Sequence, residues 1–103
     1  MKFRIERDTL GEVSIPQERA WGPQTERALE NGISVGRIPD TLWAAIIRLK
    51  RRAAQVNAQL DLIPKEVAEA IDVVATRLLK DRDYQHFQLS PYMTGSGTSA
   101  NMN

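Results

Sequence analysis

The feature that most constrains the fold is a pair of long amphipathic segments in the middle of the chain, residues 39–60 and 64–81. In the first segment, apolar residues recur at alternating intervals of four and three: Leu42, Ile46, Leu49, Ala53, Val56 and Leu60. This spacing places all of these side chains on one face of an α-helix. We therefore predict a helix over about 39–60, opened by Pro39, with this face as its packing seam.

The second segment begins at Pro64 and predicts a second helix over 64–81, with Glu66 near the positive end of its dipole. Its seam and the residues that widen it are Val67, Ile71, Val74, Leu78, Ala68, Ala75 and Leu79. Two amphipathic helices joined by a few residues pack as an antiparallel pair. Each predicted apolar face is wider than the other helix can cover. We therefore expect a further partner, either later chain or another subunit.

Shorter elements are predicted on both sides of this pair. Residues 1–16 alternate apolar and charged side chains around a turn, which favours a small β-hairpin or extended arm. The stretch "WGPQTERALEN" predicts a helix over about 23–31, because Pro23 suits a first helical residue and Asn31-Gly32 suits a helix end. Residues 99–103 look like the start of another helix. The predicted fold class is mainly α.

Composition excludes several classes of protein. The 103 residues allow one domain at most, and the formal net charge of +1 gives no field that would recruit nucleic acid or an anionic membrane. Cysteine is absent and His86 is the single histidine, so we expect no disulfide and no metal site. The longest apolar run, residues 42–47, is too short to cross a bilayer. We expect a soluble protein of a reducing compartment.

Two features admit a functional interpretation, but a plainer one is favoured. The basic run "RLKRR", Arg48 to Arg52, could bind nucleic acid. It more resembles a solvated helix face, because no aromatic residue interleaves it and the net charge is near zero. His86 could be a general base. Standing alone among packing residues, it is better interpreted as an ordinary packed or surface histidine. Trp43 is expected in the core or at an interface.

The last ten residues, "TGSGTSANMN", form a polar, hydroxyl-rich loop. Gly95 and Gly97 allow the backbone to turn its N–H groups inward, and a helix starting near Thr98 or Ser99 would favour an anion at its N-terminus. No lysine follows, so this is not the phosphate loop of nucleotide hydrolases, and the last glycine of a dinucleotide fingerprint is missing. A flexible tail or a capped loop would have the same composition. Both interpretations remain open on composition alone.

Four separated motifs point to a known family. "RIERDTLGEVSIP", "AWGPQTERALEN", "LKRRAAQVN" and "TGSGTSANMN" occur in the order and spacing seen at the N-terminus of class II fumarases, members of the fumarase/aspartase superfamily. The resemblance runs from Arg4 to Asn103. Aspartate ammonia-lyases typically carry histidine where Gln24 stands and "GGAGT" where this chain has "TGSGT". The chain departs from the fumarase pattern at Pro23, at Tyr92 (usually tryptophan) and at Met93 (usually glutamine).

The resemblance implies a fold and a role for the chain. Residues 1–103 would form the N-terminal, lyase 1-like helical domain of the fumarase/aspartase fold, incomplete at its C-terminal end. The enzyme would add water to fumarate with anti geometry to give L-malate, reversibly and without cofactor or metal. Loop 94–98 would bind the substrate carboxylate. The implied substrate-binding residues are Ser96, Gly97 and Thr98, with Thr98 foremost, and the implied loop-shaping residues are Thr94, Gly95 and Asn101.

The same resemblance implies what this chain lacks. The family's catalytic serine, its histidine with an acidic partner and a Lys-x-Asn motif come later, so no catalytic residue is expected within these 103 residues. The family assembles each site from three subunits of a homotetramer. We therefore expect the isolated chain to bind dicarboxylates weakly and to be inactive. The N-terminus has no transit-peptide character, and this favours a cytoplasmic location.

Two alternatives remain open at this point. The chain could belong to an aspartate ammonia-lyase or a related lyase that uses the same loop on another succinyl substrate. It could instead be a truncated, non-catalytic helical interaction module that pairs with a longer homologue. Activity on malate would favour the fumarase, whereas activity on aspartate alone would favour the ammonia-lyase. A folded but inactive chain that co-purifies with a longer subunit would favour the interaction module.

Overall fold

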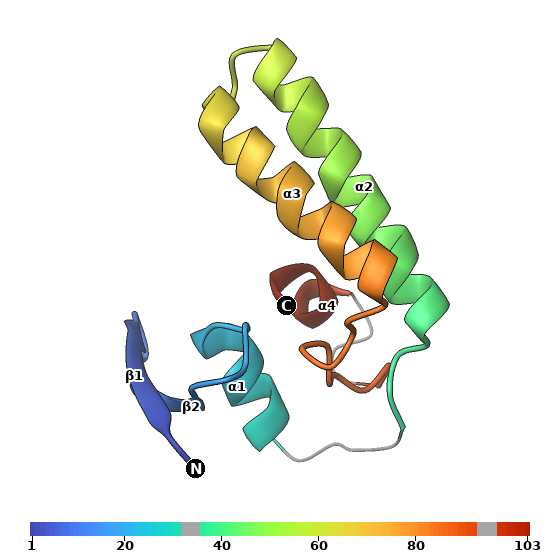
Figure 1. The fold of residues 1–103 in the computed structure, drawn as a ribbon. Helices are drawn as coiled ribbons and strands as arrows, with labels where there is room; N and C mark the ends of the chain where they lie inside the picture. The colour runs from blue at the N-terminus through green and yellow to red at the C-terminus, as the bar shows by residue number, and fades with distance from the viewer. Residues whose placement is uncertain (32–35, 93–96) are drawn as a thin grey trace. The chain divides into compact units, whose positions relative to one another are not determined.

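A computed structural model describes residues 1–31, 36–92 and 97–103. The chain divides into two compact units, each described by itself. The mixed unit comprises Met1–Ile38 and Gln85–Asn103, and the helical unit comprises Pro39–Tyr84. The mixed unit holds strands β1 and β2 with helices α1 and α4, whereas the helical unit consists of α2 and α3 (Figure 1).

The chain opens with an antiparallel hairpin of β1 (Phe3–Asp8) and β2 (Gly11–Pro16). Gly11 takes a φ of +114°, which favours glycine, and the Asp8 side chain accepts a hydrogen bond from the Leu10 amide at 2.9 Å. The predicted hairpin is therefore confirmed, with turn chemistry at the positions that suggested it. The face of the hairpin that carries the buried Val13 and Ile15 of β2 is not purely apolar, because these two residues pair with charged residues of β1.

Helix α1 (Pro23–Glu30) begins as its sequence suggests, with Pro23 at the first turn and Gly22 as N-cap. Its Leu29 packs against a buried cluster of Val13, Ile15 and Trp21, which joins the helix to β2. The short helix α4 (Thr98–Met102) lies against α1. The core of the mixed unit thus sits between the hairpin, α1 and α4.

The helical unit is an antiparallel hairpin of α2 (Asp40–Gln59) and α3 (Lys65–Asp81) (Figure 1). The turn between them contains Asp61, whose φ of 55° is left-handed, and Pro64 precedes α3 as its N-cap. Arg82, the C-cap residue that follows α3, is also left-handed, with a φ of 51°. The predicted pair of long helices is present, and its mainly α character is confirmed.

The predicted packing seam is wrong for α2 and only partly right for α3, where Ala68 and Ala75 of the predicted face are buried. Leu49 is 69% exposed and Val56 is 43% exposed on α2, and Val67 and Val74 of α3 are exposed as well. The buried residues of the two helices are instead Trp43, Ala44, Ile47, Ala54, Ala58, Ala68 and Ala75. Small side chains allow two helix backbones to approach closely, so the pair meets along its alanines and leaves the larger aliphatic residues on the outside.

Trp43 is buried, as predicted for a core or interface residue. Ile63 packs against the alanine cluster of Ala54, Ala58 and Ala68 near the turn of the hairpin. In the part of the chain that the structure describes, no helix is long and apolar enough to span a membrane.

Candidate functional site

The predicted substrate loop is only partly within the described residues. Thr94, Gly95 and Ser96 lie outside them, as does Met93. Gly97, Thr98 and Asn101 are described and exposed: Gly97 is the N-cap of α4, Thr98 its first residue and Asn101 its fourth. The structural account of the site therefore rests on its C-terminal half.

Gly97 sets the geometry with which the loop enters α4. It is the N-cap residue, with a φ of 83° and a ψ of 1°, in the left-handed region that a Cβ disfavours. A Cβ built on Gly97 would meet no atom within 4 Å among the described residues. The need for glycine at this position therefore comes from the backbone conformation and not from crowding.

Thr98 is the first residue of α4 and is exposed at the mouth of this turn. The Gly97 carbonyl accepts the Asn101 amide at 3.0 Å, which closes the first helical turn. N–H groups of a first helical turn have no carbonyl of an earlier turn to bind, and such groups favour an anion.

Contacts behind the loop hold α4 in place. Ser99 is 5% exposed and faces the interior of the mixed unit, where α4 packs against α1. The Asn103 side-chain amide donates to the His86 carbonyl at 3.1 Å. The exposed residues of α4 are thus presented from a helix whose other side is fixed.

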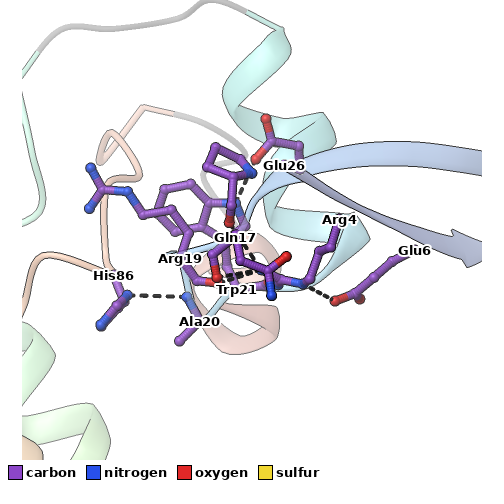
Figure 2. A network of polar contacts seen from close by, with 9 residues as sticks. Arg4, Glu6, Gln17, Arg19, Ala20, Trp21, Glu26 and His86 are labelled. Atoms are coloured by element: carbon purple, nitrogen blue, oxygen red, sulfur yellow. Dashed lines mark hydrogen bonds and ion pairs between the residues drawn. The ribbon is translucent and has the colours of Figure 1, made fainter. Parts of the chain in front are cut away.

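His86 has a structural role that the sequence did not reveal. Its Nδ1 accepts the Ala20 amide at 3.1 Å, which fixes Nδ1 as the acceptor of the ring (Figure 2). Together with the Asn103 contact, this bond links the segment before α1 to α4. The interpretation of His86 as an ordinary packed histidine agrees with these contacts. The donors to its ring nitrogen and to its backbone carbonyl, Ala20 and Asn103, lie far away in sequence. No local pattern could therefore have indicated these two hydrogen bonds.

Arg4 organises the segment that carries the "WG" motif (Figure 2). Its guanidinium donates to four backbone carbonyls, those of Pro16 at 3.0 Å, Gln17 at 3.4 Å, Arg19 at 2.8 Å and Trp21 at 2.7 Å. Its Nε also pairs with Glu6 at 2.6 Å. One side chain of β1 therefore donates to carbonyls at the end of β2 and along the irregular segment that follows it.

Trp21 is fixed on both its edge and its face. Its indole N–H donates to Glu26 of α1 at 2.6 Å, and the Arg19 guanidinium lies 5.3 Å from the centre of its ring. The Arg19 side chain also donates to the Gln85 carbonyl at 2.9 Å. The Trp-Gly motif is thus part of the framework that connects the hairpin, α1 and the segment leading towards α4.

One ion pair on the other side of α1 perturbs a titratable group. Arg27 donates to both carboxylate oxygens of Asp8, at 3.0 and 3.3 Å, and to the Gly11 carbonyl at 3.1 Å. The bonds from Arg27 hold the pKa of Asp8 below its ordinary value of 3.8. The described residues contain no cluster of three or more histidine, cysteine or acidic residues that could hold a metal ion.

Comparison with known proteins shows which sequences this chain is similar to. No protein-family model matches the sequence. The whole chain aligns with the class II fumarate hydratase of Thermus thermophilus at 43% identity and covers 23% of that protein. It aligns equally completely with those of Halalkalibacterium halodurans and Bordetella parapertussis, at 44% identity and 22% coverage of each. The chain therefore spans less than a quarter of the length of these relatives.

Solved structures agree with the sequence comparison. A class II fumarase from Schistosoma mansoni matches 97% of this chain and 22% of its own, with a TM-score of 0.91 at 29% identity. A structure from Brucella melitensis described as fumarate lyase:delta crystallin matches 96% of this chain and 23% of its own, with a TM-score of 0.86 at 32% identity. The whole chain is therefore similar in sequence and in fold to the N-terminal portion of class II fumarate hydratases.

Proposed function

We propose that this chain supplies part of the substrate site of a fumarate hydratase, the enzyme that adds water reversibly to fumarate with anti geometry to give L-malate. The observation that carries the proposal is the similarity of all 103 residues to proteins named fumarate hydratase class II. In this proposal, loop 94–98 binds a carboxylate of the substrate, and the catalytic acid and base come from elsewhere in a longer protein.

The chemistry of the reaction explains why such a loop is needed. When malate loses water, a base removes a proton from the carbon beside a carboxylate, and negative charge accumulates on that carboxylate. Donors placed where this charge develops lower the barrier. In the proposal, Ser96, Gly97 and Thr98 provide these donors, whereas Thr94, Gly95 and Asn101 shape the loop. The left-handed Gly97 supports it, because this conformation turns the chain into α4 directly at Thr98.

We also propose that the working form is a homotetramer of a longer chain and that the 103 residues alone are inactive. The exposed aliphatic residues of the helical unit support this proposal, because a longer chain or another subunit would bury them. They include Leu42, Leu49, Leu60 and Val73, which are between 49% and 69% exposed. An apolar surface of this kind on a folded chain usually marks an interaction site.

Two other functions compete with this one. Met93 and Tyr92 depart from the fumarase pattern next to the loop, which favours a related lyase such as aspartate ammonia-lyase as the second candidate. The exposed aliphatic residues of the helical unit would also suit a non-catalytic interaction module.

A chimera separates these functions. In it, this chain replaces the matching residues of the Thermus thermophilus fumarate hydratase, and the purified protein is assayed for hydration of fumarate and for release of ammonia from aspartate. Hydration of fumarate by a tetrameric chimera supports the proposal. Ammonia release without hydration would support the second candidate. A folded tetramer with neither activity would contradict both lyase functions and favour the interaction module.

A further inference from the structure

A basic face on α2 is not used by the proposed function. Arg48, Arg51, Arg52 and Gln55 stand at positions i, i+3, i+4 and i+7 along the helix, so they share one face. These four side chains line a hollow of about 290 Å³ in the helical unit. The hollow lies entirely within one compact unit, and each of its lining residues belongs to the described part of the chain.

Contacts with α3 organise this face. The Asp72 carboxylate oxygen Oδ1 accepts Arg51 Nε at 2.5 Å and Gln55 Nε2 at 3.1 Å. Gln55 in turn accepts Arg52 Nη1 at 3.3 Å. One carboxylate therefore orients Arg51 and Gln55 directly and Arg52 through Gln55. Because Arg51 uses its Nε in this pair, its terminal amino groups are not consumed by it.

The charge of the face is unbalanced. Three arginines line the hollow, and among the described residues Asp72 is the acid in contact with them, which leaves the face with a net positive charge of two. The bond from Arg51 lowers the pKa of Asp72 below its ordinary value of 3.8, so this carboxylate is charged at neutral pH. Glu69 of α3 lines a neighbouring hollow with Asp72 and Gln55, and is not part of this lining. Like charges one helical turn apart repel, and a dianion would relieve the repulsion.

We propose that this face of α2 binds a compact phosphate-bearing small molecule. The planar forks of Arg48, Arg51 and Arg52 match the oxygen geometry of a phosphate group, and the net positive charge of the face favours an anion. The hollow, at about 290 Å³, is slightly smaller than typical small-molecule sites of about 300–1,000 Å³, so we propose a compact ligand. The inference is independent of the proposed enzymatic function.

The experiment is a calorimetric titration of the 103-residue chain with inorganic pyrophosphate at low ionic strength, with circular dichroism to verify folding of each variant. We expect one pyrophosphate per chain. We expect Arg48→Gln and Arg52→Gln each to weaken the binding about tenfold or more, since each removes charge-assisted hydrogen bonds. Arg77→Gln is the matched control, because it removes an exposed arginine of α3 that does not line the hollow. It should change the affinity less than about twofold.

Several outcomes would overturn the proposal. They are the absence of binding, an equal loss in the Arg77→Gln control, and binding of malonate as tight as that of pyrophosphate. The last would assign the face to carboxylates. A single-stranded RNA oligonucleotide that binds more tightly than pyrophosphate would also overturn it, in favour of a nucleic-acid surface. Selective loss in Arg48→Gln and Arg52→Gln with an unchanged control would support it.

Discussion

The two compact units are stabilised in different ways. In the mixed unit, charged side chains reach backbone carbonyls far along the chain, as Arg4 does with Pro16, Arg19 and Trp21. In the helical unit, α2 and α3 meet along alanines, and the larger aliphatic residues remain exposed. The comparison indicates that the mixed unit depends on specific directional contacts, whereas the helical unit depends on close approach of two backbones.

The largest effect is expected when Arg4 of the mixed unit is replaced by alanine. The substitution removes the Arg4 hydrogen bonds to the carbonyls of Arg19 and Trp21 and one of the two to Pro16, which keeps the Arg19 amide, and we expect a loss of about 3 kcal/mol in the free energy of unfolding. Urea denaturation measures this loss. Arg7→Ala on the exposed side of the same strand is the control and should cost less than about 0.5 kcal/mol. Equal losses in the two variants would show that the carbonyl contacts do not stabilise the unit.

A smaller effect is expected when the alanine contact of the helical unit is enlarged. Ala54→Leu inserts a larger side chain where α2 and α3 meet, and we expect a loss of about 2 kcal/mol. Leu49→Ala, which removes a 69% exposed side chain from the predicted but unused seam, should change stability by less than about 0.5 kcal/mol. Thermal or urea unfolding measures both losses. A larger loss in Leu49→Ala than in Ala54→Leu would show that the predicted leucine seam, and not the alanines, forms the contact between the helices.

A substitution of Gly97, at the turn into α4, should destabilise the protein less than the two substitutions above. Gly97→Ala places a Cβ on a residue with a φ of 83°, and we expect a cost of about 1 kcal/mol. Gly22→Ala is a close control, because Gly22 is also an N-cap residue but has a φ of −101° that alanine adopts readily. Stability of the Gly22 variant should be unchanged or slightly higher. A Gly97 variant as stable as wild type would mean that the left-handed turn is not required.

The smallest effect is expected from pH, and it should appear in both units. Arg27 lowers the pKa of Asp8, and Arg51 lowers the pKa of Asp72, each below 3.8. A depressed pKa in the folded state gives a stabilising contribution that is present above the unfolded value and is lost as pH falls through the folded value. Stability should therefore decrease below about pH 4, and less so in Asp8→Asn and Asp72→Asn. If both variants lost as much stability below pH 4 as the wild type does, the ion pairs of Asp8 and Asp72 would not stabilise the fold.

The local signals in the sequence predicted the elements well. Asp8 and Gly11 indicated the hairpin turn, and prolines indicated where α1 and α3 begin. The long helices were predicted over 39–60 and 64–81 and are observed at Asp40–Gln59 and Lys65–Asp81, a difference of at most one residue at each end. These features depend on residues close together in sequence, which explains why they could be read there.

The packing and the supporting contacts could not be predicted in the same way. Apolar spacing identifies an amphipathic face, but it does not say whether that face meets the neighbouring helix, and here Ala54 and Ala58 do so in place of Leu49 and Val56. The contacts of Arg4 and His86 end on backbone groups, which leave no signature in the sequence. For the candidate site, the glycine-rich motif predicted a special backbone conformation, and Gly97 has one.

The most direct test of the central proposal is the effect of Thr98→Val in the chimera with the Thermus thermophilus enzyme. Thr98→Val removes one donor from the proposed carboxylate site, and we predict a decrease of about 100-fold or more in kcat for fumarate hydration. Thr76→Val, an exposed position on α3, is the matched control and should leave kcat unchanged. A Thr98→Val chimera that hydrates fumarate as fast as the parent chimera would contradict the proposed role of this loop.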